Sequence, residues 1–253
     1  MKLIDAHGHL NDEKFDDVKD VVARAAEQGL EAIICSSCNL FSSQKAVELS
    51  KQYEIVFANV GFHPENVDEM TSNSLTEIEK LAKHEKVVAI GEIGLDYYWR
   101  QDNKEKQKEV FIKQIELANK LNLPIVVHTR EAMGDTLEIL KQHKVKMPSL
   151  MHCFGGSLES AQELLKLGFS FSFGGLVTFK NAKKVVEVVK GLPIENILLE
   201  TDCPYMTPVP FRGERNESKN VVYVADEIAR IKGLTIEDVA KATTENAKRI
   251  FGI

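Results

Sequence analysis

Short apolar runs recur along the chain, and each is followed by a segment with the spacing of an amphipathic helix. Eight such runs lie at 2–6, 32–35, 55–60, 87–90, 123–127, 149–151, 169–173 and 197–199. Mostly apolar, β-branched runs of this length are typical of parallel strands buried on both faces. Eight β-then-α units in 253 residues predict a single domain, residues 1–253, with the α/β fold of a (β/α)8 TIM barrel rather than a doubly wound sheet.

The segments between the runs have helical periodicity and recognisable ends. Residues 18–25 present one apolar face, and Gly29 follows at the position of a helix stop. Capping boxes are predicted at 74–77 and 235–238, where Ser or Thr precedes an acidic residue by three positions. A final helix, about 235–251, is expected to pack outside the barrel.

Charge and composition limit the partners of the chain. Its formal net charge is −6, whereas dedicated duplex-DNA binders are usually basic, because phosphate neutralisation dominates their affinity. This argues against non-specific coating of nucleic acid but allows an enzyme whose bound cations supply positive charge. No apolar run approaches the roughly 20 residues that span a bilayer, and no signal-peptide pattern is visible. We therefore expect a cytoplasmic monomer with no membrane partner.

The cysteines fit a reducing compartment. They are Cys35, Cys38, Cys153 and Cys203. Cys35 and Cys38 have the C-x-x-C spacing of redox and zinc motifs. No second C-x-x-C or histidine pair completes a zinc site around them in the sequence. The spacing therefore favours two small residues that close a strand.

Polar side chains follow six of the predicted strands at their carboxyl ends, where barrel enzymes hold their active sites. His7 and His9 are two residues apart, so in a strand both imidazoles point to the same side and can reach one ion. His84 and His143, in contrast, fall in helical or loop patterns and are interpreted as surface residues. The candidate metal ligands are His7, His9, Glu92, His128, His152 and Asp202.

Six ligands are too many for one tetrahedral zinc ion and suit two divalent ions about 3.5–4 Å apart. Glu92 is the natural bridge, because both of its carboxylate oxygens can ligate. We assign His7, His9 and Asp202 with Glu92 to one ion, and the remaining two histidines with Glu92 to the other. Nitrogen and oxygen donors allow Mg or Mn, which we expect in function, and also Zn.

Two ions held in this way can bind a phosphodiester, generate hydroxide and offset charge on the leaving oxygen. Asp202 is the candidate to orient or deprotonate the attacking water. His63 precedes Pro64 and is open to two interpretations: it supports the ligands or contacts phosphate, or it caps its own loop. Glu200 faces the same way as Asp202, and a buried carboxylate is costly unless paired. We expect Glu200 to orient a ligand or to bind an arginine.

Six segments of the chain resemble the TatD family of metal-dependent deoxyribonucleases: IDAHGHL, GFHP, GEIGLDYY, LPIVVHTREA, HCFGGS and LLETDCPYMTPVPFRGERNE. They extend over nearly the whole chain, and their combination is specific although each alone is weak. The resemblance implies a TIM barrel of the amidohydrolase type and a two-metal site on the six ligands above. It also implies hydrolysis of DNA phosphodiesters, often as a 3′-to-5′ exonuclease on single strands. The catalytic residues would be Asp202, Glu92 and His63, with Asp5 and Glu200 supporting the ligands.

Contacts to DNA are expected around the same mouth. Arginines bind phosphate oxygens by forked hydrogen bonds, and aromatic rings stack on bases, as in proteins that bind single strands. Alternatively, the aromatic side chains fill the barrel mouth and the arginines pair with Glu214 or Asp96. The expected substrate contacts are His63, Asp96, Tyr97, Arg130, Arg212 and Arg215, with Tyr98, Trp99 and Phe211 as further rings that could stack.

Two other functions use the same residues. A binuclear lactonase or amidase would polarise the carbonyl of a small ester or amide instead of a phosphoryl group. Such enzymes commonly bridge their ions with a modified lysine, whereas Glu92 stands at that position here, which favours the nuclease. A non-catalytic binding protein on the same barrel is disfavoured, because all six ligands are present.

Overall fold

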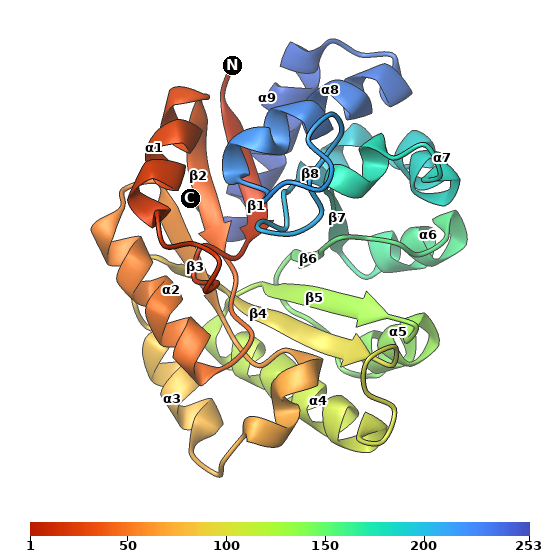
Figure 1. Ribbon diagram of the computed structural model, residues 1–253. Coiled ribbons are helices and arrows are strands. Elements are labelled where there is room, and N and C mark those ends of the chain that lie inside the picture. Colours follow the sequence, from red (N-terminus) through yellow and green to blue (C-terminus); the bar gives the residue numbers. More distant parts are fainter.

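Eight parallel strands alternate with helices in the computed structural model, which describes residues 1–253 (Figure 1). Each strand pairs with the next one along the chain, so the sheet order follows the sequence from β1 to β8. This nearly closed sheet confirms the predicted (β/α)8 TIM barrel. The strands are β1 (Leu3–Gly8), β2 (Leu30–Cys35), β3 (Val56–Val60), β4 (Val87–Asp96), β5 (Ile125–Arg130), β6 (Ser149–Met151), β7 (Phe169–Phe173) and β8 (Ile197–Leu199).

Nine α-helices surround the sheet (Figure 1). None of them combines the length and the apolar character that a membrane-spanning segment requires. Short 3-10 turns lie in the connections, including η1 (Pro64–Glu69) and η2 (Gly175–Thr178). The helices are α1 (Val18–Glu27), α2 (Leu40–Gln52), α3 (Ser74–Leu81), α4 (Lys104–Leu121), α5 (Met133–Gln142), α6 (Leu158–Lys166), α7 (Lys183–Gly191), α8 (Val221–Lys232) and α9 (Ile236–Phe251).

The seam between the first and last strands is joined by backbone hydrogen bonds beyond the end of β8. The N–H of Asp202 donates to the carbonyl of His7 over 2.9 Å, and the N–H of His9 donates to the carbonyl of Cys203 over 2.7 Å. The seam therefore closes at the carboxyl-terminal mouth, among residues that the sequence marks as metal ligands.

Apolar side chains form two parts of the core. The larger part lies between the strands and the helices and contains Ile33, Phe111 and Phe171, among others. A smaller part fills the barrel interior with side chains such as Ile34, Val126 and Leu150. This layering, with a packed interior and an outer ring of helices, is typical of TIM barrels.

Helix α9 makes a contact that the sequence did not predict. Its last turn brings Ile250 and Phe251 into the cluster that fills the barrel interior. Asn246 on the same helix donates to the carbonyl of Ile197, at the start of β8. The helix therefore lies outside the strands, as the sequence predicts, and its apolar last turn covers the amino-terminal ends of the strands.

The helix ends agree with the sequence fully at Gly29 and in part at Thr235. Gly29 ends α1 with φ +95°, a conformation that glycine adopts at little cost. Thr235 accepts a hydrogen bond from the N–H of Asp238 over 3.1 Å at the start of α9, but the Asp238 carboxylate accepts from the Thr235 hydroxyl and not from its N–H, so the predicted capping box is half formed. The capping box predicted at 74–77 is wrong, because the Ser74 hydroxyl accepts from the N–H of Thr71 instead.

Three strands extend further than their apolar runs. β1 includes His7, β4 continues through Glu92 to Asp96, and β5 includes His128. The apolar runs end where polar side chains begin. The backbone pairing of the strands nevertheless continues, and these polar side chains point into the carboxyl-terminal mouth of the barrel. His7, Glu92 and His128 are consequently held by paired strands, which fix their positions more closely than loops do, and His9, His152 and Asp202 follow shortly after strand ends.

Candidate metal centre

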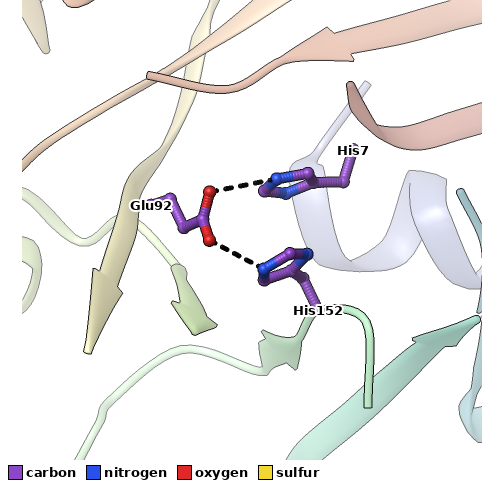
Figure 2. Close-up of side chains that lie close together, drawn as sticks. All are labelled: His7, Glu92 and His152. Carbon is purple, nitrogen blue, oxygen red and sulfur yellow. Dashed lines mark ion pairs between the residues drawn. The ribbon is translucent and has the colours of Figure 1, made fainter. Parts of the chain in front are cut away.

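The carboxylate of Glu92 lies at the centre of the carboxyl-terminal mouth, and its two oxygens face different histidines. Oε2 is 3.2 Å from Nε2 of His7 and 3.8 Å from Nε2 of His9. Oε1 is 2.7 Å from Nε2 of His152 and 2.9 Å from Nδ1 of His128. Figure 2 shows Glu92 between His7 and His152, with one oxygen directed to each ring. A carboxylate that bridges two ions needs this arrangement.

Asp202 completes one of the two groups of ligands. Its Oδ1 lies 3.2 Å from Nε2 of His9 and 3.9 Å from Nε2 of His7. The donor atoms of these three residues all lie within 4.8 Å of one another. Asp202 has φ +55°, a strained conformation for a non-glycine residue that is often found at functional sites. The seam hydrogen bond from its N–H to His7 helps to hold it there.

His63 belongs to the second group of ligands, which lies around Oε1 of Glu92 and includes His128. Its Nε2 lies 3.5 Å from Oε1 of Glu92, and the donor atoms of His63, Glu92 and His128 lie within 4.8 Å of one another. Its Nδ1 accepts from the N–H of Glu65 over 3.2 Å and caps η1. His63 therefore caps its own loop with one nitrogen and reaches the metal centre with the other.

The charges within the centre suit cation binding. Burial alone would raise the pKa of Glu92, but His152, His63 and His7 outweigh it and hold that pKa well below its usual range. The pKa of Asp202 is also lowered, because its interactions with His9 outweigh burial. Burial lowers the pKa of His63 to about 3, so this ring is neutral at pH 7 and can ligate. Both carboxylates are ionised at the same pH.

The ligand histidines have polar neighbours on their second ring nitrogens, as metal-binding histidines usually do. Nδ1 of His7 lies 3.0 Å from the Ser36 hydroxyl, and Nδ1 of His9 lies 3.2 Å from the Ser36 carbonyl. Nε2 of His128 donates to Oδ2 of Asp96 over 2.9 Å. Ser36 was not among the residues predicted to support the ligands. Its one distinguishing feature in the sequence is its position directly after a predicted strand.

Glu200 and Asp5 lie where they can support the ligands. Oε2 of Glu200 lies 3.7 Å from Nδ1 of His152 and accepts a hydrogen bond from Ser172. Asp5 accepts from the N–H and the hydroxyl of Thr201 over 2.8 and 2.6 Å, which ties β1 to the segment after β8. Burial raises the pKa of Asp5 to about 7. Neither carboxylate is in contact with solvent.

A divalent metal fits these residues. Nε2 of His7 is buried and has no hydrogen-bond partner, and a buried polar atom left in this state costs free energy. Ligation of an ion by its lone pair removes this cost. The nitrogen and carboxylate donors around Glu92 are those that bind Zn, Mn or Mg in proteins.

Comparison with known proteins agrees with this geometry. The family model described as TatD related DNase matches residues 4–252. The chain belongs to the TatD family. It is 49% identical over 253 residues to the uncharacterized metal-dependent hydrolase YabD of Bacillus subtilis, with 99% of each chain covered. It is 38% identical to the uncharacterized metal-dependent hydrolase YcfH of Escherichia coli K12, with 100% of this chain and 97% of the relative covered.

Solved structures of TatD proteins share the fold of this TatD-family hydrolase. The TatD homologue YjjV of Escherichia coli K12 aligns with a TM-score of 0.95 and 29% identity, covering 99% of this chain and 98% of that chain. A TatD-family hydrolase of Entamoeba histolytica aligns with a TM-score of 0.89 and 26% identity, covering 98% and 97%. The protein is therefore a metal-dependent hydrolase of the TatD family.

The metal centre of this TatD protein lies in an open cavity of about 1570 Å³. Of the expected substrate contacts, His63, Asp96 and Arg130 line it, and so do Trp99, Phe41 and Lys184, of which the last two were not singled out in the sequence. The guanidinium of Arg130 lies 3.8 Å from the centroid of the Tyr98 ring and 5.3 Å from that of Trp99. A cation and two rings thus lie together at one side of the mouth.

Asp96 and Tyr97 make internal contacts. Asp96 is 1% exposed; besides its contact with His128, it accepts hydrogen bonds from the N–H groups of Tyr98 and Trp99. Tyr97 is buried and donates its hydroxyl hydrogen bond to Asp135 over 2.7 Å, and it does not line the cavity. Asp96 is positioned to orient His128, and Tyr97 has no free face for a base.

Arg212 and Arg215 also lie outside the cavity lining. Arg215 pairs with Asp17 over 2.8 Å and with Glu217 over 3.2 Å. The sequence allowed pairing with other acids, Glu214 or Asp96, but the loop carries Arg215 to the side of α1 instead. The Arg212 guanidinium lies 4.3 Å from the centroid of the Phe179 ring.

Proposed function

We propose that this TatD protein is a deoxyribonuclease that uses two divalent ions to hydrolyse phosphodiester bonds at the 3′ ends of single-stranded DNA. The observation that carries the proposal is the position of Glu92, with one carboxylate oxygen directed toward His7 and the other toward His152. Glu92, with His7 on one side and His152 on the other, would hold two ions, and such a pair would stabilise both the attacking and the leaving oxygens of a phosphoryl group.

The ions, when bound, supply Lewis acidity and lower the pKa of a bound water. The remaining roles fall to side chains of the protein. Asp202 is ionised, borders the cavity and holds its Oδ1 toward the His9 side of the centre, where it can accept a proton from the attacking water. Arg130 and Lys184 line the same cavity and can neutralise phosphates on either side of the scissile bond.

The cavity itself favours a polymer end over a small ester or amide. Its volume of about 1570 Å³ exceeds the roughly 300–1,000 Å³ of pockets that enclose small molecules. Trp99 is 58% exposed and Phe41 is 75% exposed at its rim. Exposed rings beside cations are the recurring features of sites that bind single-stranded nucleic acid without reading its sequence.

The test is a cleavage assay with the metal-loaded protein. Single-stranded DNA, duplex DNA and RNA, each labelled at the 5′ end, are incubated with Mg, Mn or Zn, and a lactone panel is assayed in parallel. The proposal predicts successively shortened labelled DNA products, fastest from the single strand. Lactone turnover without DNA cleavage would support the lactonase instead, and DNA binding without product would support a binding protein.

Variants connect the activity to the centre. His7→Ala and Asp202→Asn are expected to lower the rate of cleavage by at least about 10²-fold, with the circular dichroism spectrum unchanged. His84→Ala and His143→Ala are matched controls, because both histidines lie outside the cavity lining. Equal losses in both sets would place the reaction elsewhere in the molecule.

A further inference from the structure

The two cysteines of the C-x-x-C motif have different environments. Cys35 ends β2 and is fully buried, and burial raises the pKa of its thiol to about 11. Cys38 is only partly buried and lines the cavity of the metal centre. Both thiols are free, so the motif forms no disulfide. Only Cys38 faces residues that can bind a metal.

Cys38 lies beside two of the expected metal ligands. Its Sγ, a ring nitrogen of His9 and a carboxylate oxygen of Glu92 all lie within 4.8 Å of one another. This adds sulfur to a set of donors that the sequence indicated as nitrogen and oxygen alone.

The backbone of Cys38 is fixed on both sides. Its N–H donates to the Ser42 hydroxyl over 2.9 Å, within the capping box that begins α2. Its carbonyl accepts from the N–H of His63 over 2.9 Å. The thiol is therefore presented to the cavity from a segment held by α2 and by the loop of another metal-centre histidine.

We propose that His9, Cys38 and Glu92 form a further metal position, which takes a thiophilic divalent ion such as Zn, Co or Cd in preference to Mg or Mn. Thiolate sulfur is a soft donor that favours such ions, whereas Mg and Mn favour oxygen. Zn–S and Zn–N bonds of about 2.3 and 2.0–2.1 Å put donors about 3–4 Å apart in a tetrahedral site. Small side-chain movements bring the three residues to that spacing.

Occupation of this position affects the centre as a whole. His9 and Glu92 also belong to the ligand set with His7 and Asp202, so an ion bound by Cys38 competes with the ion expected there. Binding replaces the S–H bond with a metal–sulfur bond and releases the proton to solvent. Cys38 thus determines which kind of ion the His9 side of the centre retains.

Cobalt provides a spectroscopic test that does not depend on DNA cleavage. Metal-free protein is titrated with Co²⁺, and the near-ultraviolet charge-transfer absorption of a cobalt–thiolate bond is recorded. The wild type and Cys153→Ser are expected to develop this absorption, and Cys38→Ser is expected to lack it. Cys153 is the matched control, because it lines the same cavity but is not one of the three donors.

Affinities provide a second measurement. Competition with a chromophoric chelator is expected to show Zn²⁺ binding at least about tenfold weaker in Cys38→Ser, with Mn²⁺ affinity, measured by electron paramagnetic resonance, unchanged. The proposal is overturned if the wild type gives no thiolate absorption, if Cys38→Ser retains it, or if Zn²⁺ and Mn²⁺ affinities fall together. A failure of DNA hydrolysis alone would leave these readouts unaffected.

Discussion

His128 and Asp96 are joined by a hydrogen bond of 2.9 Å between Nε2 and Oδ2, and this bond turns the other nitrogen of His128 toward Glu92. The second oxygen of Asp96 accepts from the backbone of Tyr98 and Trp99, 2.9 Å in each case. One buried carboxylate therefore fixes both a candidate metal ligand and the aromatic segment formed by Tyr98 and Trp99.

Asp96→Asn is expected to weaken metal binding by about 10–100-fold, the usual effect of losing the partner of a ligand histidine. The asparagine side chain has one acceptor oxygen and cannot serve His128 and the backbone of the aromatic segment together. Equilibrium dialysis with Mn²⁺ measures the change. Asp135→Asn is the control, because Asp135 contacts Tyr97 and Lys108 instead. An unchanged affinity in Asp96→Asn would show that His128 needs no such partner.

Metal removal is expected to destabilise the protein. An ion that binds only the folded state at 100 times its Kd contributes about 2.7 kcal/mol, which corresponds to about 5–10 °C in Tm for a chain of this size. Differential scanning fluorimetry with Mn²⁺ and then with chelator measures the shift. Glu92→Gln should show little metal-dependent shift, and His84→Ala should show the full one. A full shift in Glu92→Gln would contradict its place as the bridging ligand.

Trp99→Ala is expected to raise KM for single-stranded DNA by about 5–150-fold, equivalent to the 1–3 kcal/mol of one stacked base. The kcat should change little, because Trp99 lies at the rim and is not one of the metal ligands. Steady-state kinetics on a labelled oligonucleotide separate the two constants. Tyr223→Ala is the matched control, since this exposed ring packs against Phe211 outside the cavity lining. Comparable KM values for the two variants would remove Trp99 from the substrate site.

Arg215→Ala is expected to lower stability rather than activity. The hydrogen bond from Arg215, followed by that from Arg24, lowers the pKa of Asp17 from 3.8 to about 2. Because the folded pKa lies below the unfolded one, the stabilisation is present above pH 4 and is lost as the pH falls toward 2. Urea unfolding should thus show a loss of about 1 kcal/mol or less at pH 7, since the pair is near the surface.

The same variant should differ less from wild type at pH 2.5, where Asp17 is partly protonated. Arg212→Ala is a control for removal of a loop arginine, because Arg212 lies over Phe179 and makes no ion pair. Loss of DNA cleavage in Arg215→Ala with unchanged stability would return Arg215 to the substrate contacts predicted from sequence.

The barrel was predictable because buried strands carry a local signal. The runs at 149–151, 169–173 and 197–199 coincide with β6, β7 and β8. The run at 87–90 ends where β4 is only partly complete, because Glu92 and Asp96 interrupt the apolar pattern although the backbone pairing continues. The strand boundaries that lie next to the site residues were therefore the hardest to predict from the sequence.

The metal centre was predictable in part for a related reason. His7, His9, Glu92, His128, His152 and Asp202 meet at the mouth, because parallel strands bring their carboxyl ends together. The partners of other side chains depend on tertiary contacts that no local pattern contains. Tyr97 meets Asp135, and Arg215 meets Asp17, only after helices distant in sequence have packed.

The position of the metal centre at the seam of the barrel has a consequence for stability. His7 and Asp202 stand on the two sides of the seam, far apart in the sequence, and their main chains are hydrogen-bonded to each other. An ion held by both side chains would act as a removable cross-link that closes a loop of almost two hundred residues. Because the ion binds only the folded state, opening of the seam separates its ligands and loses the free energy of metal binding. Opening of the barrel and release of the ion are therefore expected to be a single cooperative event.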